Sequence, residues 1–523
     1  MRSWLGPRAL VAALTTVGGC HLVVGVGDLD YVTCLSPDEC DSGACVDGFC
    51  CDRACDGDCE ACNVTGVEGT CSPSPAGSGD CASGTGVCDG GGRCALGAVA
   101  WLQRLGSEGD QRAHGVAAVG TRVYVTGSFG GSIFNAMTMI DDDDGFVGML
   151  EGGDGSLPNP SGLALSDEDA AAATHPQAVT AIAATGSGAA IAGHCQGPVL
   201  YGTLFSADCD TAMSDAFWGV LGDGLGPAQM DPSFPRTISG VGAQRANGVA
   251  AGQEGDVVIC GSFTDSLGEL MANGTDGFVA VFSANFQNRW TKPLGTEGES
   301  AAHAVSVDPQ GRVVVVGDYQ GSLGLGEVPP AATKHAFVSV FSSTGQHEWS
   351  AGFGSDGAEQ RALGVAVNRH GEIAVVGSFG GSIHFDKTLT SIGGDDAFVA
   401  LLAPDGTPLW SLQLGDGANQ AAHAVAVDDR DAIIVAGGFL GTLQDVTSAG
   451  SEDAFVLKLA QNGTQLWLRT DGSAGDDRAT SVSVDPSGSI YAAGYAAGSL
   501  DFGANNPPAA NEGLDAFVVK WGP

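Results

Sequence analysis

Residues 361–414 decide the fold. They contain four short runs: RALGVAV from Arg361, IAVVGSFGGS from Ile373, DAFVALL from Asp396 and PLWSLQL from Pro408. Each run is apolar or β-branched and is bounded by Gly, Asp, Asn or Pro, which is the pattern of short antiparallel strands separated by tight turns. The segment therefore predicts a unit of four strands, which we call strands A to D.

This unit recurs along the chain with a period of about 60 residues. A glycine in the second strand recurs at Gly127, Gly193, Gly261, Gly317, Gly377, Gly437 and Gly494. A phenylalanine in the third strand recurs at Phe146, Phe217, Phe278, Phe337, Phe398, Phe455 and Phe517. Four-stranded units repeated around an axis form a β-propeller, so the two columns predict an all-β fold of seven blades over residues 98–523.

The tryptophans predict how the ring closes. The fourth strand carries Trp290, Trp349, Trp410 and Trp467, and an extra copy, Trp101, lies before the first A strand. The seventh C strand runs to Trp521, and only Gly522 and Pro523 follow it. We therefore expect residues 98–105 to supply the missing D strand, since an unclosed ring would leave an open sheet edge.

The N-terminus predicts export and lipidation. Arg2 and Arg8 precede the apolar run Ala9–Val17, which is too short for a transmembrane helix and is typical of a signal peptide. The run ends in Val-Gly-Gly-Cys20, similar to a bacterial lipobox, so we expect residues 1–19 to be removed and Cys20 to be lipidated. An ordinary signal peptide cut nearby is the alternative. His21, rather than Asp, follows the cysteine and favours the outer membrane or cell surface.

Residues 34–97 form a cysteine-rich module that follows a tether at residues 20–33. Twelve of the sixteen cysteines lie between Cys34 and Cys94, in a stretch with few large apolar side chains. Disulfides are therefore expected to replace a hydrophobic core, although their connectivity cannot be read from spacing. The alternative is zinc, because Cys59 and Cys62 have the spacing of a zinc knuckle.

The composition limits the partners. The formal net charge is −40 and 83 residues are glycine. A polyanion is repelled by such a chain, so nucleic acid is not expected as a partner. We expect contact with the membrane through the lipid anchor, together with an unidentified extracellular protein or glycan.

No catalytic motif of the common hydrolase, metalloprotease or nucleotide-binding types occurs in the chain. No cofactor is therefore expected, with calcium as the one alternative, at the acidic run Asp141, Asp142, Asp143 and Asp144. A solvated turn that caps the C strand of blade 1 is the simpler explanation of this run. Similar aspartates precede the phenylalanine column, for which we expect a turn-forming role with the carboxylate accepting backbone N–H groups.

A basic column precedes the A strands. Its members are Arg112, Arg245, Arg361 and Arg478, with His175 assigned to the blade 2 slot and Ala301 and Ala421 to blades 4 and 6. Two residues later come His114, Gln177, Asn247, His303, Leu363, His423 and Thr480. The residues that enter the innermost strand lie at the channel mouth of a propeller. This ring either pairs with carboxylates and fastens neighbouring blades, or binds an anionic or glycan ligand.

Two further features concern the remaining cysteines. Cys195 and Cys209 lie within blade 2 and are expected to bridge its B and C regions. Cys260, in the apolar run Val257–Cys260, is interpreted as a small buried hydrophobe rather than a nucleophile.

The repeat resembles the SBBP-type propeller repeats of bacterial surface proteins, and the cysteine-rich module after a lipobox is similar to exported lipoproteins of Gram-negative bacteria. The resemblance implies fold and location but no single activity. The leading functional hypothesis is a surface-displayed, non-enzymatic recognition or scaffold protein. Alternatives are an extracellular polysaccharide hydrolase or lyase, for which His114, His303 and His423 would be inspected for carboxylate partners, and a purely structural envelope lipoprotein.

The anchor is directly testable. Because the thiol of Cys20 is the atom that would carry the lipid, Cys20→Ala should move the protein from the membrane fraction to the soluble fraction. Cell fractionation with immunoblotting measures this, with Cys260→Ala as the matched control. A Cys20→Ala protein that stays with the membrane would exclude the lipobox.

Overall fold

The computed structural model describes residues 97–134, 137–138, 144–158, 161–167, 176–186, 188–201, 205–222, 225, 235–504, 508 and 513–522, with short stretches before residue 96 (40, 44–46, 49–52, 55, 60–61, 71–73, 87–88 and 94–95). The chain divides into two compact units, Met1–Ala98 and Val99–Pro523. No helix among the described residues is long and apolar enough to cross a membrane. Cys20, Cys59 and Cys62 lie outside the described residues.

The N-terminal unit contains disulfide-bonded cysteines. Cys40 bonds to Cys50, and Cys55 bonds to Cys71. The described strands are three two-stranded pairs: β1 (Cys45–Val46) with β2 (Phe49–Cys50), β3 (Glu60–Ala61) with β4 (Ser72–Pro73), and β5 (Val87–Cys88) with β6 (Cys94–Ala95). Elements this short bury little apolar surface, so covalent bridges supply the order that a core would otherwise give.

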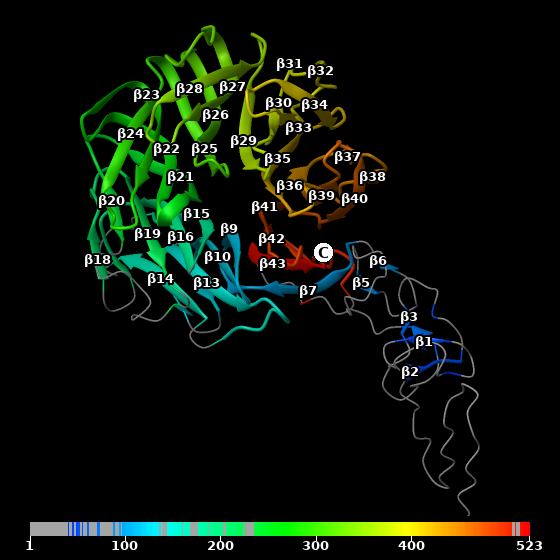
Figure 1. Ribbon diagram of the computed structural model, residues 1–523. Coiled ribbons are helices and arrows are strands. Elements are labelled where there is room, and N and C mark those ends of the chain that lie inside the picture. The colour runs from blue at the N-terminus through cyan, green and yellow to red at the C-terminus, as the bar shows by residue number, and fades with distance from the viewer. Residues whose placement is uncertain are drawn as a thin grey trace, which may run out of the picture. The chain divides into compact units, whose positions relative to one another are not determined.

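The second unit is a seven-bladed β-propeller, as predicted, with the A strands around the centre (Figure 1). Blades 1 to 4, in the order A to D, are β9 (Gln111–Val119), β10 (Arg122–Phe129), β13 (Asp144–Glu151) and β14 (Gly162–Asp167); β15 (Ala178–Thr185), β16 (Gly188–Cys195), β19 (Asp215–Leu221) and β20 (Arg236–Ile238); β21 (Gln244–Ala251), β22 (Val257–Leu267), β23 (Leu270–Phe282) and β24 (Asn288–Leu294); and β25 (Glu297–Val307), β26 (Val313–Ser322), β27 (Ala331–Phe341) and β28 (His347–Phe353).

Blades 5 to 7 are β29 (Gln360–Val367), β30 (Ile373–Phe379), β33 (Asp396–Leu402) and β34 (Pro408–Leu414); β35 (Gln420–Val427), β36 (Ile433–Phe439), β39 (Asp453–Leu459) and β40 (Gln465–Asp471); and β41 (Asp477–Val484), β42 (Ile490–Ala496), β43 (Asp515–Trp521) and β7 (Val99–Arg104). The B–C connections of blades 5 and 6 carry small hairpins, β31 (Ser382–His384) with β32 (Thr388–Thr390) and β37 (Thr442–Leu443) with β38 (Val446–Thr447).

The glycine column exists because strand A bulges against strand B. In every blade one A-strand residue is skipped in the pairing, directly before the register shift opposite the glycine. A Cβ at any of these seven glycines would lie only 1.9 to 2.2 Å from an A-strand carbonyl oxygen, for example 1.9 Å from the carbonyl of Arg361 at Gly377. Only a residue without a side chain fits there.

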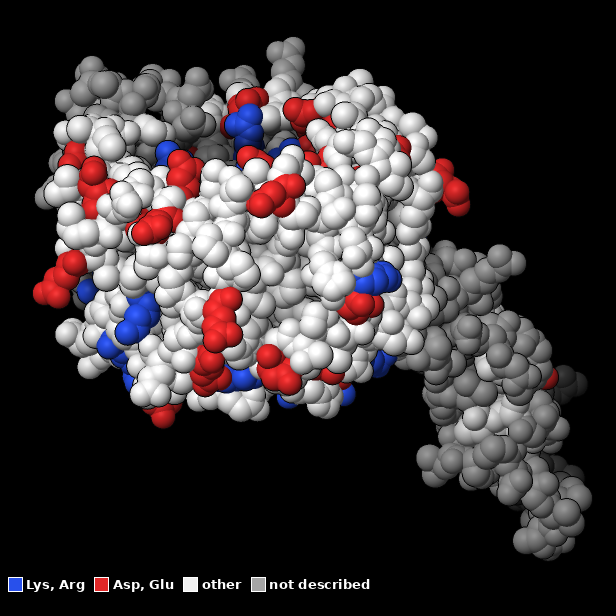
Figure 2. Space-filling view, turned by 90° about the horizontal axis from the view of Figure 1, so that it is seen from above, with Lys and Arg blue, Asp and Glu red and all other residues white. Residues whose placement is uncertain are grey.

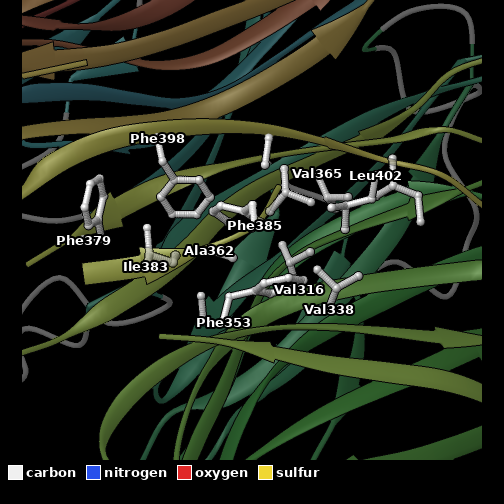
Figure 3. Close-up of a cluster of buried hydrophobic side chains, with 14 of the residues drawn as sticks. Val316, Val338, Phe353, Ala362, Val365, Phe379, Ile383, Phe385, Phe398 and Leu402 are labelled. Carbon is white, nitrogen blue, oxygen red and sulfur yellow. The ribbon is translucent and has the colours of Figure 1, made fainter. Parts of the chain in front are cut away.

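The core lies between the blades. One cluster combines Val316 and Val338 of blade 4 with Phe379 and Phe398 of blade 5, all fully buried (Figure 3). Phe385, which follows β31, stacks on Phe353 with ring centroids 4.7 Å apart. Alternate strand residues point to opposite faces, so each blade contributes one face to each neighbouring core, which explains the near-continuous apolar strands.

The tryptophan column fastens successive blades. Each indole N–H donates to a carbonyl in the C–D turn of the next blade: Trp290 to Ser343 at 3.1 Å, Trp349 to Pro404 at 3.2 Å and Trp410 to Gln461 at 2.9 Å. A turn glycine packs on each indole; a Cβ at Gly345, whose φ is 78°, would lie 2.7 Å from the Trp290 ring. The D-strand tryptophan is thus a latch to the following blade.

The predicted closure is confirmed. Strand β7 pairs antiparallel with β43, from Val99 opposite Trp521 to Arg104 opposite Phe517. Arg104 forms a buried ion pair with Asp515 at 2.5 Å, and the Trp101 indole donates to Gly152 of blade 1 at 3.2 Å. The first described residues of the propeller therefore complete blade 7 and latch it to blade 1.

Blades 1 and 2 lack the D-strand tryptophan and use other latches. The hairpin of β17 (Pro198–Tyr201) and β18 (Phe205–Asp208), inserted between the B and C strands of blade 2, pairs with β14 and widens blade 1 to six strands. The predicted Cys195–Cys209 disulfide is present at the base of this hairpin. Towards blade 3, Trp218 stacks on Phe282 with centroids 4.5 Å apart.

The glycine column yields a stability prediction. Gly377→Ala should lower the free energy of unfolding by at least about 2 kcal/mol, because the new methyl group must displace the Arg361 carbonyl and distort the bulge. Gly417→Ala is the matched control, since a Cβ there meets only the Ile392 carbonyl at 3.7 Å. Urea unfolding followed by tryptophan fluorescence measures both, and equal losses in the two variants would contradict the bulge argument.

Candidate functional site

The seven bulge residues meet at the centre of the ring. They line one cavity of about 230 Å³. The bulge residues in its lining are His114, His303 and His423 from blades 1, 4 and 6, Thr180 and Thr480 from blades 2 and 7, Asn247 from blade 3 and Leu363 from blade 5. The sequence prediction of a common ring at the channel is therefore correct for six blades.

The assignment in blade 2 was wrong. The register of β15 with β16 skips Thr180, so Thr180 rather than Gln177 is the bulge residue, and Ala178 rather than His175 occupies the preceding slot. His175 itself lies outside the described residues. The error arose because Gln177 and His175 are polar residues three positions upstream of the true residues, Thr180 and Ala178, and only the pairing with Gly193 fixes the register.

Several bulge side chains fasten neighbouring A strands. Thr180 donates to the Ala246 carbonyl of blade 3 at 2.6 Å, and Thr480 donates to the Ala113 carbonyl of blade 1 at 2.8 Å. The Asn247 amide donates to the Ala302 carbonyl of blade 4 at 2.9 Å. These three residues hold the inner ring together and leave the histidines as its chemically distinctive members.

His303 pairs with a buried carboxylate. Its Nε2 lies 2.5 Å from Asp318 Oδ2, and Lys334 Nζ lies 3.4 Å from Asp318 Oδ1. Burial by itself raises the pKa of Asp318, but the hydrogen bond from His303 and the charges of His303, Lys334 and Arg361 outweigh burial and hold the pKa below its ordinary value. The blade 4–5 seam thus contains histidine, carboxylate and arginine.

A similar group occurs at the blade 6–7 seam. The guanidinium of Arg478 donates through Nε to Glu452 at 3.1 Å, and His423 Nε2 lies 4.0 Å from the same carboxylate. Glu452 reaches this place because position 438 is glycine; a Cβ there would lie 2.0 Å from Glu452 Oε1. These residues line a second cavity of about 290 Å³, together with Asp395, Asn419, Ser451 and Asp476.

The basic column is mostly neutralised. Arg112 pairs with Asp110 at 3.3 Å, Arg361 pairs with Glu359, and Arg478 pairs with Glu452. Figure 2 shows acidic and basic side chains spread in small groups over a mostly uncharged surface. Arg112 and Arg361 each pair with a carboxylate two residues earlier in the same entry segment, so of these three pairs only that of Arg478 fastens neighbouring blades, joining blade 7 to blade 6.

Burial shapes the protonation of the ring. Desolvation, followed by the charge of Arg112, lowers the pKa of His114 from 6.5 to about 4. Desolvation also lowers the pKa of His423, despite the opposing effect of Glu452. Both imidazoles are therefore neutral near pH 7, where a neutral ring can donate one hydrogen bond and accept another.

The other residues selected from the sequence have structural surroundings. Asp144 is buried at the start of β13, whereas Asp141, Asp142 and Asp143 lie outside the described residues. Aspartates of the column before phenylalanine accept backbone N–H groups, as Asp453 does from Ala449 at 2.9 Å. Cys260 is fully buried, and burial raises the pKa of its thiol. Within the part of the chain that the structure describes, no group of three or more His, Cys, Asp or Glu residues is arranged to hold a metal ion.

Sequence reasoning missed several residues at the mouth: Asp318, Glu452, His194 and Ser214. Asp318 and His194 each directly follow a column glycine, and Glu452 and Ser214 each directly precede a column aspartate. Alignment on these columns would have placed them, but the B strands were read only for their apolar pattern.

Comparison with known proteins adds little. No family model and no curated protein matches the chain. Among solved structures, the polysaccharide lyase Uly1 is 10% identical with a TM-score of 0.41 over 82% of this chain and 92% of that one. Sqt1 from Chaetomium thermophilum is 13% identical with a TM-score of 0.39 over 75% and 83%, and Trypanosoma rangeli sialidase is 9% identical with a TM-score of 0.37 over 82% and 56%. Likenesses this weak carry no functional argument, so the propeller assignment rests on the strand pairing.

The protonation of His114 predicts a pH effect. Between pH 6.5 and about 4 the unfolded chain binds a proton at this residue that the folded protein does not, so stability falls as the pH falls. From pH 7 to pH 4.5, His114→Gln should lose about 1 to 2 kcal/mol less free energy of unfolding than the unmodified protein. The exposed His384→Gln is the control. Urea titrations at both pH values measure this, and an equal loss in all three proteins would rule out a buried, neutral His114.

Proposed function

We propose that the protein is a surface-displayed recognition lipoprotein that binds a hydroxyl-rich ligand, such as a glycan, at the channel-mouth face of the propeller. The cavity at the blade 5–7 face carries this proposal. It is lined by carboxylates, amides and hydroxyls around the paired Arg478 and Glu452. Paired charges that keep some hydrogen-bonding groups free suit a polar ligand, because they can orient the hydroxyl groups of a ligand that carries no charge.

The charge of this cavity argues for a neutral ligand there. Asp395, Glu452 and Asp476 face one arginine, so the lining is net acidic and repels an anion. Leu440, which is 36% exposed, adds an apolar contact at the rim. Sugar rings present both hydroxyl and C–H surfaces, which matches this mixed lining.

Display at the cell surface is part of the proposal. Support comes from the signal peptide and lipidated Cys20 that the sequence predicts, and from the disulfides Cys40–Cys50 and Cys55–Cys71, which suit an oxidising, extracytoplasmic setting. The similarity to SBBP-type repeats and exported lipoproteins of Gram-negative bacteria points the same way. The lipid would hold the protein at the outer membrane or cell surface.

An extracellular polysaccharide hydrolase or lyase is the second candidate. It is favoured by the contact of His303 with Asp318, since a histidine beside a carboxylate can act as a general base. Binding is preferred because Asp318 is only 2% exposed and is already engaged by Lys334, so the pair resembles a fastening at the seam.

A glycan array with the purified protein tests the proposal. We expect selective binding of neutral glycans, and a loss of about tenfold in affinity for Asp476→Ala, since removing one hydrogen-bonding carboxylate from the cavity costs about 1.4 kcal/mol or more. Asp501→Ala, an exposed aspartate outside the cavity, is the control. Release of shortened oligosaccharides during incubation would favour the enzyme instead, and no binding to any glycan would reject the proposed ligand class.

A further inference from the structure

Equivalent positions at the blade seams form a four-residue frame. The frame consists of the bulge residue, the B-strand residue after the column glycine, the residue three positions before the C-strand phenylalanine, and the residue two positions before the bulge of the next blade. At the blade 4–5 seam these are His303, Asp318, Lys334 and Arg361, and at the blade 6–7 seam they are His423, Gly438, Glu452 and Arg478. Each of these two seams holds one protein carboxylate beside the arginine of the next blade.

The blade 2–3 seam has the arginine but no carboxylate in the frame. The register places Thr180, His194, Ser214 and Arg245 at the four positions. His194 stands where Asp318 stands in blade 4, and Ser214 stands where Glu452 stands in blade 6. The negative group that the other two seams contain is therefore missing here.

Two of the polar side chains at this seam have atoms without partners. Nδ1 of His194 and Oγ of Ser214 are buried and have no hydrogen-bond partner among the residues that the structure describes. Arg245 is exposed, and among the described residues its guanidinium forms no ion pair or hydrogen bond. Buried polar atoms are rarely left unpaired, so two such atoms beside a free guanidinium indicate a place for an acceptor.

The charges around His194 reinforce this conclusion. Burial, then the charges of Arg245 and His114, lower the pKa of His194 to about 4. Two carboxylates of blade 2 are engaged by backbone N–H groups: Asp215 accepts from Asp210 at 2.8 Å, and Asp210 accepts from Ala212 at 2.7 Å. An anion at the seam would face the cationic side chain of Arg245, whose charge acts on His194.

We propose that the blade 2–3 seam binds a carboxylate of the ligand, such as that of a uronic acid, in the place that Asp318 and Glu452 fill at the other seams. The Arg245 fork would bind both carboxylate oxygens, and Ser214 and His194 would donate to them. This inference rests on the proposed function for its location on the channel-mouth face. It concerns a different seam from the blade 5–7 cavity, for which we propose a neutral ligand.

The proposed site predicts proton-linked binding. A bound carboxylate favours the protonated form of His194, so binding draws a proton onto the ring and affinity rises as the pH falls from 7 towards 5. A neutral sugar at the blade 5–7 cavity lacks this link. The direction of the pH effect therefore separates the two sites.

Isothermal titration calorimetry of the full-length protein with D-glucuronate and with D-glucose tests the proposal. We expect glucuronate to bind more tightly at pH 5 than at pH 7, and Arg245→Gln to weaken it by at least about tenfold. Arg361→Gln, at a seam that already holds a carboxylate, should change glucuronate affinity less than about twofold.

Two variants of one residue supply the decisive comparison. His194→Asp places a carboxylate beside Arg245, as Asp318 lies beside Arg361, and should abolish glucuronate binding. His194→Asn is nearly the same size without the charge; it should retain weaker binding that no longer depends on pH. Equal binding by His194→Asp and the unmodified protein, or no binding of glucuronate at all, would overturn the proposal. Neutral glycans that still bind His194→Asp would leave the proposed function standing without this site.

Discussion

The propeller depends on the contact between an A-strand carbonyl and the glycine opposite it. At each of the seven blades the carbonyl oxygen would lie within 2.2 Å of any added Cβ, so the bulge and the glycine require each other. The bulge turns one side chain out of the regular pairing and towards the axis, which gives the channel its seven lining residues. One steric constraint in the backbone thus determines both the repeat and the position of the mouth.

Each blade must also be fastened to the next, and different seams do this through different contacts. From blade 3 to blade 6 a D-strand indole bonds to the following C–D turn, and Trp101 does the same across the closure. Trp467 has no such turn to bond, because the D strand of blade 7 comes from the other end of the propeller; it lies near Trp521 instead, with centroids 6.0 Å apart. Blade 1 gains a hairpin from blade 2 in place of a tryptophan. Every latch buries apolar surface or pairs backbone groups that an open ring would expose.

Much of the fold could be predicted from the sequence because the same local geometry recurs from blade to blade. This geometry requires glycine, phenylalanine or tryptophan at fixed positions, so these residues repeat along the chain. The closing strand followed from Trp101 for the same reason. The site could be read only in part. His303 and His423 were found, but Asp318 and Glu452 were not, because the glycine and aspartate columns beside them were interpreted only as strand and turn markers. Blade 2 was misassigned because His175 and Gln177 offered polar residues close to the expected spacing, whereas the register is fixed by Gly193.

Bulge and latch together make a closed ring of equally secured blades. Amide hydrogen exchange of the native protein, followed by mass spectrometry, tests this, since exchange reports local opening along each strand. We expect β9 and β41, on either side of the closure, to exchange as slowly as β25 and β29 on the far side of the ring. Exchange in β9 and β41 that is faster by about a hundredfold or more, with β25 and β29 still protected, would contradict it.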